Sequence, residues 1–176
     1  MRISLSINPA KPPMLTLTDY AIRIGLSMAA GFVVGIERER KDKPAGIKTH
    51  MLVSLGATIF VLSSLEFAND HDKLLNGNQS VIQLDLMRVI GGLIGGIGFL
   101  GAGAIMQRRG DVEGITTATT IWVTAALGMV CGIGQLKLAF VSILSVLIVL
   151  YVFGALERYL EKHVFKTRGP SKPDTP

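Results

Sequence analysis

The chain has 176 residues, of which 49% are hydrophobic and 18% charged, with a mean hydropathy of +0.46. A soluble domain of this length seldom carries several near-uncharged runs of roughly 17 residues or more, each long enough to cross a membrane. The single cysteine, Cys131, excludes an intramolecular disulfide and CxxC-type metal clusters. The net charge of +5 does not indicate a nucleic-acid partner, because Lys and Arg cluster in short segments between apolar runs.

Five apolar runs predict five transmembrane helices, at residues 20–36, 50–65, 89–106, 115–133 and 136–156. At a rise of 1.5 Å per residue, about 17–20 residues cross a hydrocarbon core of about 30 Å. The expected fold class is therefore all-α, a polytopic membrane protein. Residues 1–18 are expected to form a polar N-terminal arm, 19–160 the membrane domain and 161–176 a basic disordered tail.

The distribution of basic residues predicts the orientation. If five helices cross, one side carries twelve of the 18 Lys and Arg residues, namely Arg38, Arg40, Lys41, Lys43, Lys48, Arg108, Arg109, Arg158, Lys162, Lys166, Arg168 and Lys172. Cytoplasmic loops of membrane proteins are enriched in these residues. The N-terminus is thus expected outside and the C-terminus in the cytoplasm.

The first apolar run contains Gly31 and Gly35, a spacing that favours close helix packing, and is followed directly by Glu37 and Arg38. A carboxylate at a helix C-terminus is disfavoured by the macrodipole, so a basic neighbour should compensate Glu37. Two interpretations stay open: an interfacial ion pair, or a carboxylate that attracts a cation near the mouth of a pathway. Glu37 is the one candidate metal ligand.

The connection after the first run reads KPAGIKTH and leads back into the membrane. Gly46 belongs to a Pro-Ala-Gly turn, and Thr49 or His50 is expected to cap the next helix. His50 is a poor candidate for a metal ligand, because no second His or Cys lies within ligand spacing.

The third run is the richest in glycine, with seven glycines within residues 91–103. In lipid such residues let helix backbones approach closely, so we expect this segment to lie at the centre of the packing. An alternative is a partly unwound helix whose carbonyls line a polar cavity, as in transporters. Ser80 and Gln83 form a capping-box pattern that starts this helix near Val81, and Asp85 is placed to pair with Arg88.

The fourth run opens with several threonines, and Thr117, Thr120, Thr124, Gly128 and Cys131 share one helical stripe. Each hydroxyl can bond a carbonyl of its own helix, which makes threonine inexpensive in lipid. The preferred interpretation is a polar seam that faces the glycine-rich helix. Trp122 lies too deep for an ordinary interfacial residue and is assigned either to gating or to packing.

Signatures of catalysis are missing from the sequence, which has no GxSxG, HExxH or P-loop motif. We therefore expect a protein that is not an enzyme and has no cofactor. The residues of the proposed functional motif are Glu37, Arg38, Gly46, Thr49, His50, Gly98, Gly101, Gly103, Thr116, Thr117, Thr120 and Trp122.

Four blocks together resemble the MgtC/SapB family of bacterial inner-membrane proteins, in the family's order. They are GIERE at 35–39, PAGIKTH at 44–50, GIGFLGAGAI at 96–105 and GITTATTIW at 114–122. Lys48 and Thr119 depart mildly from the family pattern, which is expected to have Arg and Ala there. Many relatives carry a cytoplasmic ACT-like C-terminal domain, and we expect this chain to lack it because the sequence ends soon after its last predicted helix.

The resemblance implies a multi-pass protein of the bacterial inner membrane, linked to magnesium homeostasis and to stress or virulence adaptation. Two functional hypotheses follow. The first is a non-catalytic protein that contacts another membrane complex, and the second is a transporter or channel for Mg²⁺ or another divalent cation. Apart from the lipid bilayer, the expected partners are a second copy of the chain, with a dimer favoured, and another membrane complex.

Overall fold

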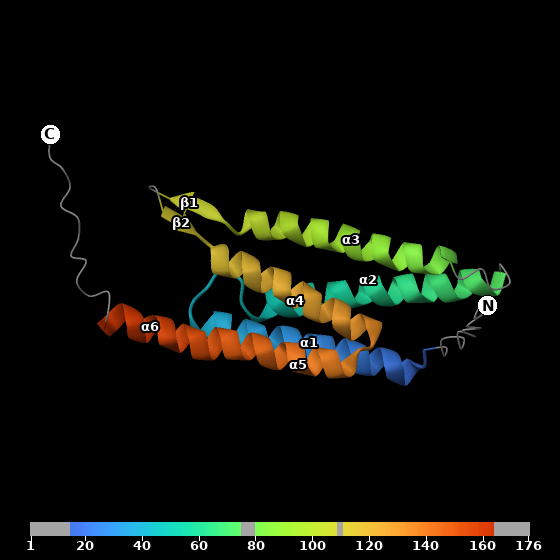
Figure 1. Cartoon of the computed structure of the whole chain (residues 1–176), viewed down its shortest axis with the longest axis horizontal. Helices are drawn as coiled ribbons and strands as arrows, with labels where there is room; N and C mark the ends of the chain where they lie inside the picture. Colours follow the sequence, from blue (N-terminus) through green and yellow to red (C-terminus); the bar gives the residue numbers. More distant parts are fainter. Residues whose placement is uncertain (1–14, 75–79, 109–110, 164–176) are drawn as a thin grey trace, which may run out of the picture.

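The computed structural model describes residues 15–74, 80–108 and 111–163, with side chains for 15–68, 87–107, 111–160 and 162–163. The fold is all-α apart from one small strand pair (Figure 1). Its helices are α1 (Leu17–Arg40), α2 (Ile47–Leu74), α3 (Ser80–Gly103), α4 (Ile115–Ile133), α5 (Leu136–Leu147), the π-helix η1 (Ile148–Phe153) and α6 (Gly154–His163). The proposed pairings of Ser80 with Gln83 and of Asp85 with Arg88 involve side chains outside the described residues.

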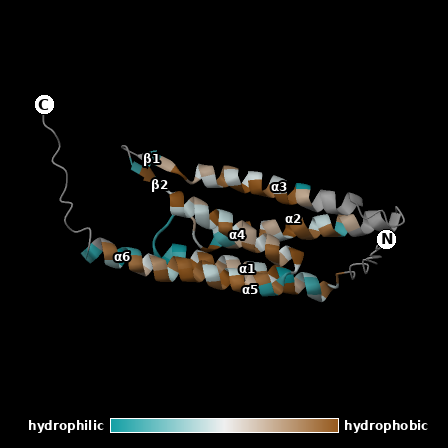
Figure 2. Ribbon diagram, viewed as in Figure 1, coloured by the Kyte–Doolittle hydropathy of each residue, from teal (hydrophilic) through white to brown (hydrophobic). Residues whose placement is uncertain are grey.

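Four helices are long and apolar enough to cross a membrane, covering Leu17–Arg40, Ile47–Ala68, Ile115–Ile133 and Leu136–Leu160. The last of these runs through α5, η1 and α6 without a break (Figure 1). The apolar part of α3 described here, Met87–Gly103, is shorter. Hydrophobic residues follow the length of all these helices (Figure 2), which makes the chain a multi-pass membrane protein.

Successive helices run back and forth, so the connections fall at two opposite ends of the bundle (Figure 1). One end holds the α1–α2 loop, the strand pair and α6. The start of α1 and the α4–α5 turn lie at the other end. Among the described residues, the basic clusters of the sequence meet at the first of these ends, as the predicted alternation of five spans requires.

The core lies between α1, α2 and α4. Of the candidate spans α4 is the most enclosed, with 61% of its apolar window buried, whereas only 6% of the α5–α6 window is buried. Ala30, Val34, Ala57, Ala125 and Leu127 are the main apolar residues of this core. Because the outer faces of the spans meet lipid, large exposed hydrophobic side chains on them need no protein partner.

The prediction that the glycine-rich segment forms the centre of the packing is wrong for the single chain. At Gly91, Gly95 and Gly98 an added Cβ atom would meet nothing within 4 Å. Gly101 alone of the α3 glycines faces a neighbour, with Ala118 at 3.7 Å from such an atom. The described part of α3 is also helical throughout, which does not support an unwound segment.

The predicted third span also ends too late, since α3 stops at Gly103 and Met106 lies in a strand. The N–H groups of Ala104 and Ile105 bond the carbonyls of Gly101 and Ala102, which turns the chain out of the helix. Strands β1 (Met106–Arg108) and β2 (Asp111–Glu113) then pair antiparallel as a short ribbon that leads into α4. The sequence pattern did not predict this ribbon.

Candidate functional site

A continuous stripe of small and polar residues fills the contact between α1, α2 and α4, and we call it the polar seam. It consists of Ser27, Gly31, Gly35 and Arg38 on α1, His50, Ser54 and Thr58 on α2, and Thr117, Thr120, Thr124 and Gly128 on α4. These residues recur at spacings of three and four, so each set lies on one face of its helix. Every one of them is buried.

The glycines of the seam bring the three helices to backbone contact. A Cβ atom on Gly31 would lie 2.5 Å from the His50 carbonyl oxygen, and one on Gly35 would lie 2.6 Å from the Cα of Ile47. Gly128 of α4 meets α2 in the same way, with the Ser54 carbonyl oxygen 2.2 Å from the added atom. Side chains larger than hydrogen therefore cannot enter these contacts without separating the helices.

His50 joins α2 to α4 from inside the bundle. Its Nδ1 lies 2.9 Å from the Gly46 carbonyl oxygen, and its Nε2 lies 3.2 Å from the Thr120 hydroxyl. Since a carbonyl only accepts, Nδ1 donates a hydrogen to Gly46, and the contact of Nε2 with Thr120 links α2 to α4. The same hydroxyl donates to the Thr117 carbonyl of its own helix at 2.9 Å.

Deeper in the seam, hydroxyls bond backbone carbonyls. The Thr124 hydroxyl donates to the Thr120 carbonyl at 2.7 Å. The Thr58 hydroxyl lies 3.0 Å from the Ser54 carbonyl and 2.8 Å from that of Gly128, the second being a contact across helices. The Ser54 hydroxyl, also fully buried, has no hydrogen-bond partner among the described residues.

The basic end of the seam is closed by a buried charge cluster. The Glu37 carboxylate contacts the Lys41 ammonium and lies 3.6 Å from the Arg38 guanidinium, while Glu37 and Arg38 are only 2% and 3% exposed. The guanidinium also donates to the Thr117 hydroxyl at 3.1 Å, which ties α1 to the start of α4. A basic neighbour for Glu37 was predicted, and the structure supplies two of them.

The loop between α1 and α2 is held by a second carboxylate, that of Glu39, which accepts the Ile47 N–H at 3.0 Å. Gly46 lies directly beside it, and an added Cβ there, 1.8 Å from the Glu39 carboxylate, would displace that side chain. The carbonyl of Gly46 in turn accepts a hydrogen bond from Nδ1 of His50. The PAGIKTH block thus places His50 inside the seam.

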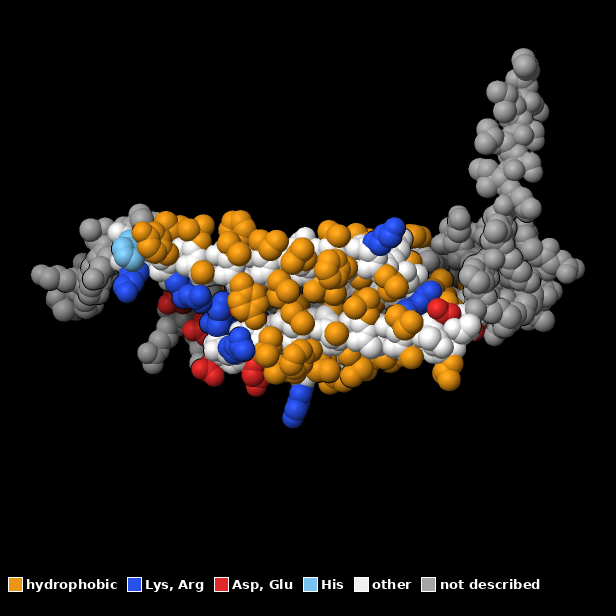
Figure 3. Space-filling model, turned by 90° about the horizontal axis from the view of Figure 1, so that it is seen from below, with side chains coloured by type: hydrophobic (Ala, Val, Ile, Leu, Met, Phe, Trp, Pro, Cys, Tyr) orange, Lys and Arg blue, Asp and Glu red, His pale blue; other side chains and the backbone are white. Residues whose placement is uncertain are grey.

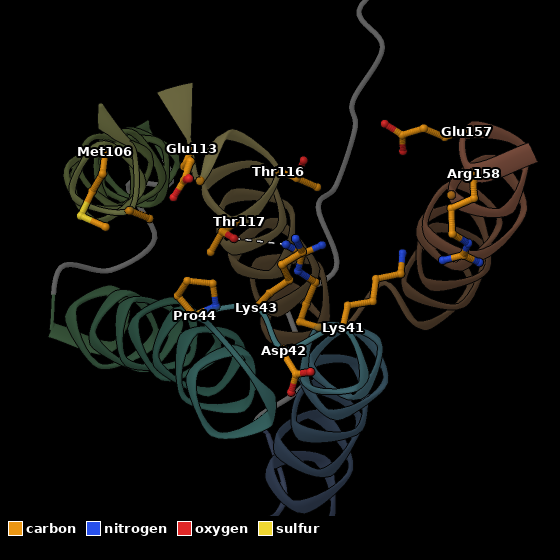
Figure 4. A pocket seen from close by; sticks show the side chains of 14 residues that line it. Lys41, Asp42, Lys43, Pro44, Met106, Glu113, Thr116, Thr117, Glu157 and Arg158 are labelled. Atoms are coloured by element: carbon orange, nitrogen blue, oxygen red, sulfur yellow. Dashed lines mark hydrogen bonds between the residues drawn. The ribbon is translucent and has the colours of Figure 1, made fainter. Parts of the chain in front are cut away.

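Next to the charge cluster lies a cavity of about 870 Å³, which we call the basic-end pocket. It is bordered by the α1–α2 loop, the ribbon, the start of α4 and α6 (Figure 4). Its charged lining residues are Arg38, Lys41, Lys43, Arg158, Asp42, Glu113 and Glu157. Figure 3 shows that Lys and Arg gather at this end, whereas the body of the bundle is mostly covered by hydrophobic side chains.

The structure brings half of the proposed motif together and leaves the rest outside. Glu37, Arg38, Gly46, His50, Thr117 and Thr120 meet at the seam and its basic end. Thr49, Gly98, Gly103, Thr116 and Trp122 are exposed, although Thr116 still borders the basic-end pocket, and Gly101 packs on Ala118. Trp122, 50% exposed on the outer surface of α4, neither plugs nor fills the bundle.

The predicted threonine stripe of α4 is present but faces a different partner. It lies against α1 and α2, whereas a seam with the glycine-rich helix was expected. Ser27, Ser54 and Thr58 were not predicted from the sequence, nor was the hydrogen bond from Arg23 to the Gly132 carbonyl at 2.7 Å. The signal was available for α2, since His50, Ser54 and Thr58 recur every four residues.

The seam offers little for metal binding. Within the described part of the chain, no three His, Cys, Asp or Glu side chains converge to hold an ion. Mg²⁺ is normally held by one or two carboxylates together with retained water, and Glu37 is the only buried carboxylate among the residues that the structure describes. Its charge is already balanced by Arg38 and Lys41.

A tight three-helix core with buried charges at one end defines the class, a helical membrane protein. Comparison with known families identifies the family within that class. The MgtC family model matches residues 24–159, which include the whole polar seam. The chain therefore belongs to the MgtC family.

Named relatives cover most of this chain. Protein SrpB of Synechococcus elongatus is 37% identical over 78% of the chain and 76% of its own length. The "Putative magnesium transporter YhiD" of Escherichia coli is 37% identical over 78% of the chain and 62% of its own length. Protein MgtC of Salmonella typhimurium is 34% identical over 76% of the chain, which spans 52% of that relative. No solved structure matches the chain.

Proposed function

We propose that this chain is a non-catalytic inner-membrane protein of magnesium homeostasis that acts by contact with other membrane proteins. Membership of the family supports the link to magnesium, since YhiD carries a magnesium transporter name. The observation that carries the mode of action is the contrast between a seam closed by backbone contacts and an open glycine face on α3.

The seam supports contact rather than ion passage. At Gly31, Gly35 and Gly128 the helices approach too closely for an added methyl group, which leaves no room for a hydrated cation. Passage of Mg²⁺ would also require carboxylates along the route, and beyond Glu37 and Arg38 the described side chains of the seam offer hydroxyls and an imidazole.

The glycines of α3 supply the docking face in this proposal. Gly91, Gly95 and Gly98 leave the backbone open within the single chain, and such surfaces allow close approach of another helix. A second copy of the chain is the first occupant to test, with a two-fold dimer expected. Contact with a different membrane complex would use the same face.

The decisive comparison uses Gly95→Leu and the matched variant Gly25→Leu, because neither site has an atom within 4 Å of an added Cβ. Both variants should remain monodisperse in detergent. Gly95→Leu should abolish cross-linking to copies or partners and growth in low magnesium, whereas Gly25→Leu should preserve both. Equal, normal behaviour of the two variants would refute docking through α3.

The alternative is a transporter or channel for Mg²⁺ or another divalent cation, with Glu37 near its mouth. The observation that favours this alternative is that the basic-end pocket reaches Arg38 and Thr117 at the start of the seam. Proteoliposomes containing only the purified chain should show no Mg²⁺ flux above empty vesicles. Flux that disappears with Glu37→Gln would establish the alternative.

We further infer that the basic end faces the cytoplasm, following the positive-inside rule. Lys43 and Lys137 are both exposed and lie at opposite ends of the bundle. A membrane-impermeant thiol reagent added to intact cells should label Lys137→Cys and spare Lys43→Cys. Cys131 is fully buried and contributes little background. The reverse labelling pattern would invert the orientation.

A further inference from the structure

We propose that the basic-end pocket binds a phosphate group, carried either by a membrane phospholipid or by a soluble phosphate compound. The pocket combines a helix N-terminus, a buried arginine with an unused donor and two exposed basic side chains at the end of the spans. This inference does not depend on whether the chain acts by contact or by transport.

The first element is the start of α4. Its N-cap is Gly114, which offers no capping side chain, and the first bond within the helix runs from the Ala118 N–H to the Gly114 carbonyl at 2.9 Å. The N–H groups of Ile115, Thr116 and Thr117 therefore have no acceptor within the helix. Gly114, Thr116 and Thr117 line the pocket, so the positive end of the helix dipole borders it.

The second element is Arg38, which lines the same pocket. Its side chain is 3% exposed, and one terminal nitrogen is used by the Thr117 hydroxyl. The Nε–H is buried and has no hydrogen-bond acceptor among the described residues. A buried unsatisfied donor of a charged group is costly, and a phosphate oxygen is a suitable acceptor for it.

The third element is the distribution of the remaining charges. Lys43 and Arg158 are exposed and reach the pocket from the α1–α2 loop and from α6. The acidic lining residues, Asp42, Glu113 and Glu157, are all exposed, and the Asp42 carboxylate points away from Thr117 (Figure 4). Of the two buried charges, Arg38 and Glu37, it is Arg38 that lines the pocket and bonds Thr117 at the start of α4.

The position and size of the pocket fit both sources of phosphate. The candidate span of α1 ends beside the pocket, and that of α4 begins there. The pocket therefore lies at the level where lipid headgroups meet water. Its volume of about 870 Å³ exceeds what one phosphate needs and accommodates a headgroup or a small phosphorylated compound.

The experiment measures binding to the purified full chain in detergent. The lipid arm compares dioctanoyl phosphatidylglycerol with dioctanoylglycerol, which lacks the phosphate. The soluble arm compares inorganic pyrophosphate with chloride at equal ionic strength. A double variant, Lys43→Gln with Arg158→Gln, removes two charges from the pocket. The matched control, Arg40→Gln with Lys137→Gln, removes two exposed charges that do not line it.

Binding in either arm that weakens about tenfold in the pocket variant and less than about twofold in the control supports the site. Binding of phosphatidylglycerol alone assigns the phosphate to lipid, and binding of pyrophosphate alone assigns it to a soluble compound. Absence of binding in both arms, or equal weakening in the two double variants, overturns the proposal.

Discussion

The α1–α2–α4 core and helix α3 both carry glycines spaced four residues apart, yet the two regions use them in opposite ways. In the core, Gly31, Gly35 and Gly128 each press against the backbone of a neighbouring helix. On α3, Gly91 and Gly95 face open space. Between helices in lipid, small residues favour association wherever a partner is available, so spacing alone does not reveal whether that partner belongs to the same chain.

The polar residues sharpen the same contrast. Every core helix adds side chains that bond across to another helix or to its own carbonyls, such as Arg38, His50 and Thr120. The described side chains of α3 add no such link. A stable helix contact in lipid therefore combines close backbones with satisfied polar groups, and α3 has only the open backbone.

The largest effect is expected for Gly128→Leu, because an added Cβ already lies 2.2 Å from the Ser54 carbonyl oxygen. The α2–α4 contact should separate, and the purified protein should aggregate or lose its monodisperse peak in size-exclusion chromatography. Gly95→Leu serves as the control and should elute as the parent does. Indistinguishable profiles for the two variants would contradict the distinction between glycines that contact a neighbouring helix and glycines that face open space.

Glu37→Gln should lower the free energy of unfolding by about 3 kcal/mol, since it leaves the buried Arg38 guanidinium without its countercharge. The neighbouring Glu39→Gln should cost less than about 1 kcal/mol, because Glu39 is exposed and an amide oxygen still accepts the Ile47 N–H. Denaturant unfolding in mixed micelles measures both values. A cost as small for Glu37 as for Glu39 would mean that the buried cluster is not formed.

His50→Ala should cost about 2 kcal/mol, through a cavity inside the bundle and loss of the bonds to Gly46 and Thr120. Its neighbour Thr49 is exposed, so Thr49→Ala should change stability by less than about 0.5 kcal/mol. The same unfolding assay compares the two. If Thr49→Ala is the more damaging change, the orientation of α2 described here is incorrect.

The smallest effect is expected for Thr117→Val, about 1 kcal/mol, from loss of the hydroxyl that accepts from Arg38. Thr119→Val is the matched control, because it makes the same nearly isosteric exchange on the same helix. It removes only a hydrogen bond from an exposed hydroxyl to the Thr116 carbonyl. Thermal unfolding should place Thr119→Val within error of the parent. Equal losses in the two variants would show that the link from Arg38 to α4 adds nothing.

Sequence by itself determined the class of protein and much of the seam. Long apolar runs are sufficient to predict membrane helices, because every backbone polar group in lipid must be bonded within the segment. The threonine periodicity of α4 predicted its polar stripe, and the position of Glu37 at a helix end required basic neighbours. Family resemblance carried by four short blocks was also visible in the sequence and is confirmed.

Only the tertiary structure decided which surfaces meet. Glycine spacing is the same whether a helix contacts its own chain, another chain or lipid, so the sequence placed α3 at the centre and the fold places α4 there. Likewise, the pairing of His50 with Thr120 joins residues 70 apart. Contacts of this kind depend on how three helices rotate about their axes, and that rotation is fixed by mutual packing rather than by any one segment.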